Sequence, residues 1–197
     1  MQQLATTIPD VLVFEPTLHG DSRGYFMETW RQSDFEQLAK QLDGESSGSG
    51  ATAAAVGYDF VQDNQSKSSR GTLRGLHYQL EFPQGKLVRV ISGEVFDVAV
   101  DLRQSSPSFG QWVGVILSAE NHKQLWLPPG FAHGFYVMSE SAELVYKCTD
   151  YFHPEDDHSL LWNDPELNIA WPLLDASPLL SQKDASALPL ARAALFK

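Results

Sequence analysis

The sequence predicts a mainly β protein, an antiparallel jelly-roll barrel with a few short helices. Short apolar segments recur at close spacing through the second half of the chain, and Gly, Pro, Ser and Asn separate them. Helical spacing is limited to one clear segment and the C-terminal tail. Many short strands at this spacing are typical of a sandwich or barrel. The 197 residues can bury a sizeable core, and we expect a single domain over residues 1–197.

The N-terminal part predicts two strands, one helix and an insert. Residues 11–14 are apolar and residues 24–30 alternate loosely, which favours two short strands around a turn at residues 19–24. Ser33 can cap a helix that should end near Asp43, because apolar residues follow it at helical spacing. The Ser-, Gly- and Ala-rich stretch 45–57 has no pattern that could bury a face, so we expect a flexible insert there.

The rest of the chain predicts strands in close succession and then a helical tail. The expected strands are residues 87–91, 95–100, 112–117, 124–127, 135–138 and 144–148. Residues 92–94, Ser-Gly-Glu, predict a hairpin turn between the first two strands. A short helix is expected near residues 181–186.

Charge and cysteine content exclude several classes of protein. With 14 Lys and Arg against 25 Asp and Glu, the net charge of −11 argues against general binding to nucleic acid or to an anionic membrane. No apolar run is long enough to cross a bilayer, and residues 1–10 lack a signal-peptide pattern. The single cysteine, Cys148, cannot form an internal disulfide, so we expect a cytoplasmic protein. A small anionic ligand responds to local charge and is not excluded.

Residues 74–79 form the first candidate site. On a strand His77 and Gln79 share one face, and a bend at Gly75 would bring Arg74 into the same site. Taken alone, His77 is equally compatible with a core histidine bonded to a backbone carbonyl.

Other candidates also have an ordinary interpretation. Lys86 precedes an apolar strand, where a lysine is usually solvated. Tyr146 is either part of the core or a proton donor that faces a cavity. Asp184 stands near a helix start, where it can interact with the helix dipole. Arg23 and Arg74 stand near glycines and could clamp a diphosphate, although ordinary surface charge is the more common role of such residues.

The segment 128–135, which contains His133, resembles together with His77 the two metal-binding motifs of the cupin barrels. Cupins use a His-x-His pair with a Glu and a further His, but here the pair is His77-Tyr78-Gln79. A carboxamide is a poor ligand for transition metals, so the residues present disfavour a metal-dependent enzyme. We expect neither a metal nor another cofactor.

A series of segments, in order along nearly the whole chain, resembles the dTDP-4-dehydrorhamnose 3,5-epimerases. The segments are residues 20–26, 60–66, 73–77, 84–89, 93–101, 109–112, 117–121, 131–135, 161–164 and 169–172. Only the insert 45–57 and the last residues fall outside the resemblance.

This resemblance implies a metal-free, homodimeric, cupin-type barrel that acts on a thymidine diphosphate sugar with a C4 ketone, in dTDP-rhamnose biosynthesis. Such a ketone acidifies the hydrogens at C3 and C5, so each centre can invert through an enolate. The resemblance implies that His77 is the base and that Asp184 orients it. It further implies that Tyr146 is the acid on the other ring face and that Lys86 stabilises the enolate, in place of their ordinary interpretations.

The resemblance also implies a set of substrate-binding residues. They are Arg23 and Arg74 at the diphosphate, with Glu28, Gln62, Asn64, His133, Asp157 and Lys183 at further positions. Two positions depart from the family pattern: it often has an aromatic residue at His19 and a glutamate at Asp157. Without the family, Asp157 lies in an expected exposed loop. The preferred nucleotide base therefore stays open.

Three functions remain to be separated. The chain could invert both sugar centres, invert only one with the same groups, or bind a nucleotide sugar without catalysis. The joint presence of His77, Asp184, Tyr146 and Lys86 argues against the third, because binding alone needs no opposed acid and base.

Overall fold

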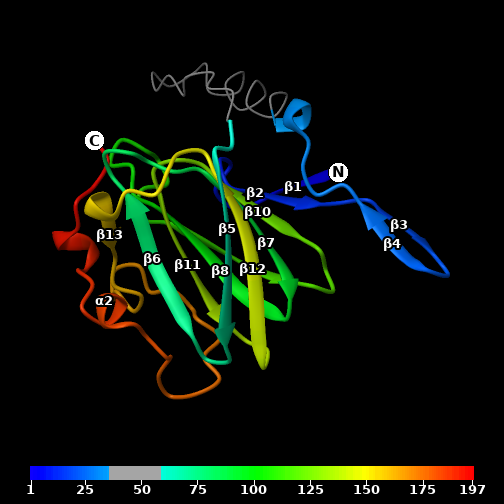
Figure 1. The fold of residues 1–197 in the computed structure, drawn as a ribbon. Helices are drawn as coiled ribbons and strands as arrows, with labels where there is room; N and C mark the ends of the chain where they lie inside the picture. Colours follow the sequence, from blue (N-terminus) through cyan, green and yellow to red (C-terminus); the bar gives the residue numbers. More distant parts are fainter. Residues whose placement is uncertain (36–58) are drawn as a thin grey trace.

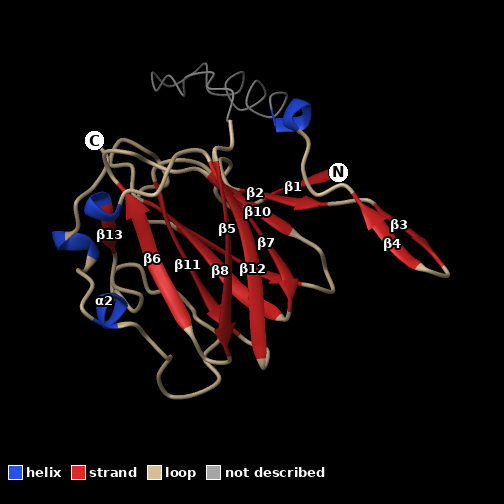
Figure 2. Ribbon diagram, in the orientation of Figure 1, coloured by secondary structure: helices blue, strands red, loops and turns tan. Residues whose placement is uncertain are grey.

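The protein is a barrel of two facing antiparallel sheets (Figure 1; Figure 2). The computed structural model describes residues 1–35 and 59–197. Its strands are β1 (Gln2–Ala5), β2 (Leu12–Glu15), β3 (Leu18–Asp21), β4 (Gly24–Met27), β5 (Gln62–Ser69), β6 (Leu73–Gln79), β7 (Lys86–Ser92), β8 (Glu94–Asp101), β9 (Trp112–Ser118), β10 (Gln124–Leu127), β11 (Phe131–Val137), β12 (Ser141–Cys148) and β13 (Asp157–Ser159). One sheet has the order β1-β2-β10-β7-β12-β5, the other β13-β6-β11-β8-β9, and β3 pairs with β4 alone. The predicted jelly-roll class is confirmed.

The strand predictions hold except at two connections. Residues 19–21, predicted in a turn between the first two strands, belong to β3, which pairs with β4, whereas β2 pairs with β1 and β10. β10 has its predicted bounds, and the other five strands predicted after residue 86 overlap their segments. The hairpin turn predicted at residues 92–94 is wrong. β7 pairs with β10 and β12, whereas β8 pairs with β9 and β11. The chain crosses there from one sheet to the other, with Gly93 in the left-handed region at a φ of 76°.

Helices are few and short in the described ranges. Helical residues begin at Gln32, so Ser33 lies inside this helix and does not cap it. The rest of this predicted helix and the predicted insert fall outside the described residues. The tail contains η1 (Pro154–Asp156), α2 (Gln182–Ala185) and η2 (Leu190–Arg192), and α2 confirms the predicted short helix. None of the helices in residues 1–35 and 59–197 is long and apolar enough to span a membrane.

An apolar core fills much of the barrel interior. Alternate residues of the facing strands point inward and form one buried cluster, which includes Val88, Val90, Val95, Ala99, Phe131, Phe135 and Leu144. On the five-stranded sheet, residues of the other parity, such as Leu76, Val98 and Val100, pack with the tail residues Leu160, Leu167 and Leu190. The tail therefore covers the outer face of this sheet and brings α2 beside β6 (Figure 1).

The hairpin of β3 and β4 projects away from the barrel (Figure 1). Its aromatic side chains Tyr25 and Phe26 are 58% and 70% exposed. Arg23 stands in its turn, where its side chain is almost fully exposed and paired with Asp21. The hairpin thus presents apolar and charged groups that its own barrel does not cover.

Candidate active site

The inward positions that elsewhere form the apolar core are polar in one part of the barrel. On the six-stranded sheet they are Lys86, Tyr146, Cys148, Asn64 and Gln62. The register places Lys86 opposite Cys148, and Tyr146 opposite Asn64. Asn64 donates to the Cys148 sulfur over 3.6 Å and accepts from the Gln62 amide at 3.0 Å. This wall carries one cation, one phenol and two amides.

The facing wall carries two histidines and two carboxylates. His77 of β6 lies directly opposite His133 of β11 in the strand register. His77 bonds to Asp184 of α2, and His133 bonds to Asp97 of β8. The two sheets therefore oppose titratable groups of different kinds across the barrel interior.

Gly75 brings Arg74 onto the inward face together with His77. Between the pair Arg74–Phe135 and the pair His77–His133, β6 advances by three residues whereas β11 advances by two. The extra residue forms a β-bulge, so that Arg74 and His77 lie on the same face although they are an odd number of residues apart. Gly75 has a φ of 117°, and a Cβ there would lie 2.6 Å from the His133 carbonyl oxygen. The bend predicted at this glycine is confirmed.

The pair of His77 and Asp184 fixes the orientation of the imidazole. His77 Nε2 lies 2.5 Å from Asp184 Oδ1, and the other carboxylate oxygen accepts from Ser181 Oγ at 2.8 Å. Burial raises the pKa of Asp184, but the hydrogen bonds from His77 and Ser181 outweigh it and hold this pKa below its usual value. The carboxylate is therefore ionised, Nε2 carries the proton, and Nδ1 is the ring nitrogen left to act as a base.

The side chains of Tyr146 and Lys86 on the facing wall have no hydrogen bond or ion pair to another described residue. Burial raises the pKa of the Tyr146 phenol, which therefore keeps its proton at neutral pH. Burial lowers the pKa of Lys86, an effect that Cys148 and the charges of Asp157 and Asp97 oppose. Lys86 is only partly exposed, and the register places it on the inward face opposite Cys148. It is therefore not the solvated lysine of its ordinary interpretation.

The prediction that Asp157 lies in an exposed loop is wrong. Asp157 begins β13, pairs with Gln79 of β6, and is partly buried. It forms an ion pair with Lys183 of α2. The pair joins α2 to the sheet edge near His77, and both residues belong to the predicted binding set.

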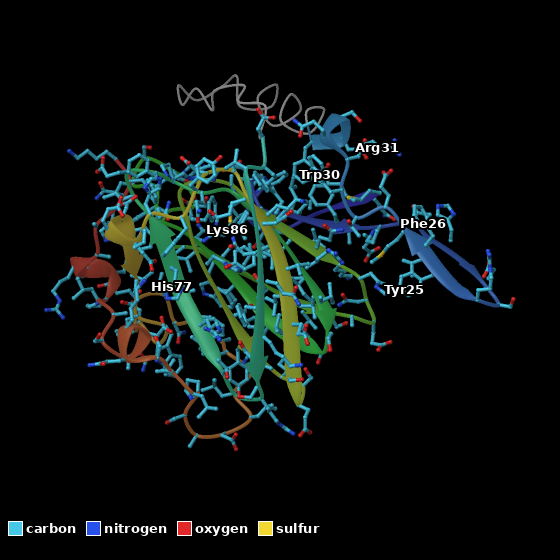
Figure 3. All side chains as sticks on the ribbon, viewed as in Figure 1. Tyr25, Phe26, Trp30, Arg31, His77 and Lys86 are labelled. Carbon is cyan, nitrogen blue, oxygen red and sulfur yellow. The ribbon has the colours of Figure 1, made fainter. Side chains whose placement is uncertain are left out.

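Arg23 and Glu28 are not brought to the other site residues within one chain. Arg23 stands at the hairpin turn, and Glu28 follows β4 and pairs with Arg31 at 2.7 Å. Figure 3 places the hairpin's Tyr25 and Phe26 on the far side of the barrel from His77 and Lys86. The predicted clamp of Arg23 and Arg74 is therefore not formed by a single chain.

Gln79 stands where a cupin would place a metal-binding histidine, and its amide is fully engaged. Its nitrogen donates to the carbonyls of Phe82 and Tyr151 at 2.7 and 3.1 Å, and its oxygen accepts from His153 N at 2.8 Å. Over residues 1–35 and 59–197, no group of three or more His, Cys, Asp or Glu could hold a metal ion. Gln79 here locks neighbouring loops to β6.

Sequence reasoning did not select Asp97. Its signal was present, since it is an acidic residue at an inward position within the apolar strand 95–100. The hydrogen bond to His133, 2.8 Å long, comes from a neighbouring strand and only the fold reveals it.

Comparison with known proteins decides the family. The family model described as dTDP-4-dehydrorhamnose 3,5-epimerase matches residues 5–192. The chain belongs to this epimerase family. A dTDP-4-dehydrorhamnose 3,5-epimerase of Pseudomonas aeruginosa is 54% identical over 196 residues, which cover 100% of this chain and 99% of that protein.

Solved structures of epimerases share the fold closely. A dTDP-6-deoxy-D-glucose-3,5-epimerase of Legionella pneumophila, in complex with dTDP-4-keto-L-rhamnose, is 49% identical with a TM-score of 0.87 and covers 100% of this chain and 97% of its own. A 3'-monoepimerase of Streptomyces bikiniensis, in complex with dTDP-quinovose, is 35% identical with a TM-score of 0.80 and covers 95% of this chain and 87% of its own. The epimerase fold therefore carries both double and single inversion.

Proposed function

We propose that this chain is an isomerase that inverts C3 and C5 of dTDP-4-dehydro-6-deoxyglucose and yields dTDP-4-dehydrorhamnose. The observation that carries the proposal is the opposition of a carboxylate-held imidazole, His77, to a protonated phenol, Tyr146, on the two walls of one barrel. Inversion needs this arrangement, because the proton must leave one face of the sugar ring and return to the other.

Each inversion proceeds in two proton transfers. His77 Nδ1 takes the proton from the carbon beside the ketone, and the electron pair of the C–H bond moves onto the C4 oxygen as an enolate. The enolate then takes the proton of the Tyr146 hydroxyl at the opposite face of the same carbon. Solvent returns the proton to Tyr146 and removes it from His77, so the net change is stereochemical only.

Charge on the walls supports both steps. Asp184 stabilises the imidazolium that forms when His77 takes a proton. The ammonium of Lys86 stabilises the enolate oxygen, and its burial strengthens this interaction relative to water.

The remaining polar groups fit a nucleotide diphosphate sugar. Arg74 faces inward on the same strand as His77 and is suited to the diphosphate. Lys183 of α2, paired with Asp157 at the edge of this sheet, is a second cation on the same side of the site as His77 and Asp184. Gln62, Asn64 and His133 supply hydrogen-bonding groups for the sugar. We expect this chemistry in the cytoplasm and without a metal or other cofactor.

We further propose a homodimer in which the β3–β4 hairpin of each copy completes the site of the other. The hairpin carries Arg23 and exposed aromatic rings away from its own barrel (Figure 1). A second copy related by a twofold axis gives these groups a surface to cover and adds a cation to the diphosphate site.

Complementation tests the homodimer. Arg23→Ala and His77→Ala proteins are each expected to be nearly inactive, and a mixture refolded together regains about a quarter of wild-type activity, because half of its dimers contain one intact site. A mixture as inactive as its components, or a monomer in solution, contradicts this arrangement.

Deuterium incorporation tests the reaction itself. The protein is incubated with dTDP-4-dehydro-6-deoxyglucose in deuterium oxide, and exchange is followed by NMR. Deuterium at both C3 and C5 supports the proposal. Deuterium at one centre identifies a single-centre epimerase such as the Streptomyces bikiniensis neighbour, and deuterium at neither identifies a binding protein.

A further inference from the structure

Asp97 takes no part in the reaction proposed above, yet its side chain is fully buried at an inward position of β8. Its Oδ1 bonds to His133 Nε2 at 2.8 Å. Its Oδ2 is also buried and has no hydrogen-bond partner among the described residues. A buried carboxylate oxygen without a partner is costly in a folded protein, so its presence calls for an explanation.

Lys86, on the facing sheet, is a cation whose side chain also lacks a described partner. Its ammonium has no hydrogen bond or ion pair to another described residue, although burial disfavours its charge. Cys148, Asp157 and Asp97 are the groups whose negative charge would favour the charged form of Lys86. Burial raises the pKa of the Cys148 thiol, which therefore stays neutral and leaves the two carboxylates. Asp157 is already paired with Lys183, whereas Asp97 Oδ2 is uncommitted.

We propose that Asp97, anchored by His133, is a positioning residue that keeps the Lys86 ammonium charged and directed at the reacting part of the substrate. This inference rests on the proposed function, which places Lys86 at the enolate oxygen. An unpaired lysine can occupy many rotamers, and a fixed carboxylate on the opposite wall limits them. His133 forms its hydrogen bond with Oδ1 of Asp97 and leaves Oδ2 of Asp97 available to Lys86.

β10, which pairs with β7, carries no titratable group. The titratable groups around Lys86 come from the other elements of the site. They are Asp97 of β8, His133 of β11, His77 of β6, Tyr146 and Cys148 of β12, Asp157 of β13, and Lys183 and Asp184 of α2. Among these described groups, Asp97 alone combines a negative charge with an uncommitted buried oxygen.

Asp97→Asn tests the inference with little change of shape. The amide can still accept from His133, but it places an uncharged NH2 where Oδ2 stood. The Lys86 pKa in the ligand-free protein, followed by NMR of 13C-labelled lysine and assigned with Lys86→Arg, should fall by about one unit. In the pH dependence of kcat, the apparent pKa of the alkaline limb should fall by a similar amount. At neutral pH, kcat should fall about tenfold with KM nearly unchanged.

Val95→Ala is the matched control, because Val95 lies two positions earlier on the same inward face of β8. It should lower thermal stability and leave the Lys86 pKa unchanged. If Asp97→Asn does not fold, His133→Ala serves instead, since it keeps the carboxylate charge but removes its anchor and should lower kcat with a smaller pKa change.

The two proposals fail separately. A Lys86 pKa and an alkaline limb that stay at wild-type values in Asp97→Asn, beside an inactive Lys86→Ala, overturn the positioning role alone. Full activity of Lys86→Ala overturns the assignment of Lys86 in the proposed function.

Discussion

Asp184→Asn should disable the base without disturbing the fold. Asp184 Oδ1 lies 2.5 Å from His77 Nε2, and Oδ2 accepts from the Ser181 hydroxyl at 2.8 Å. In the asparagine variant the amide oxygen stays with Ser181, so the NH2 group faces His77 Nε2 and donates to it. The imidazole proton must then move to Nδ1, which leaves no lone pair toward the substrate.

The size of this effect follows from two losses. The charged hydrogen bond is worth about 1.5–3 kcal/mol, which corresponds to roughly 10–150-fold in rate. The wrong tautomer adds to this, so we expect kcat to fall by about a thousandfold or more. The assay is deuterium incorporation at C3 and C5 by NMR, with KM nearly unchanged.

Ser181→Ala is the control for this prediction. It removes the α2 cap, at a cost of about 1 kcal/mol in stability, but keeps the Asp184 charge, so activity should fall less than about tenfold. An Asp184→Asn protein within threefold of wild-type kcat would refute the proposed pairing of carboxylate and base.

Four further predictions follow from named contacts. Tyr146→Phe should retain some exchange catalysed by His77 but lose correct inversion, which NMR of the product measures. Gly75→Ala should destabilise the protein by about 2 kcal/mol or more in urea unfolding, because its Cβ would clash with the His133 carbonyl oxygen at a positive φ; an unchanged midpoint contradicts this. The free energy of unfolding should be nearly constant between about pH 5 and 8 and fall below about pH 4, because folding holds the pKa values of Asp101, Asp156 and Asp184 below their usual value and these groups take up protons more readily when unfolded. A chelator such as EDTA should leave the initial rate unchanged, and a metal-reversible loss would contradict the absence of a metal.

Strand alternation predicted much of the site, because it depends only on neighbours in sequence. The shared face of His77 and Gln79 follows from period two, and the bend at Gly75 follows from the freedom of glycine. The bulge that completes this bend is visible only in the register between β6 and β11.

Long-range pairing set the limit of prediction. Residues 92–94 have the composition of a hairpin turn, but the strands on either side find partners in different sheets. Asp157 looked like a loop residue because β13 is three residues long and polar. The partnership of Asp97 with His133, and of Asp157 with Lys183, joins segments distant in sequence, and neither spacing nor composition encodes it.

The central claim is that His77 is the base at this site, and His77→Ala tests it most directly. His158→Gln is the matched control, since His158 pairs with Tyr78 and stacks on it, on the outer face of the five-stranded sheet. In deuterium oxide, His77→Ala should incorporate no deuterium at C3 or C5 above the uncatalysed rate, while His158→Gln should match wild type. Incorporation by His77→Ala at the wild-type rate would contradict the account.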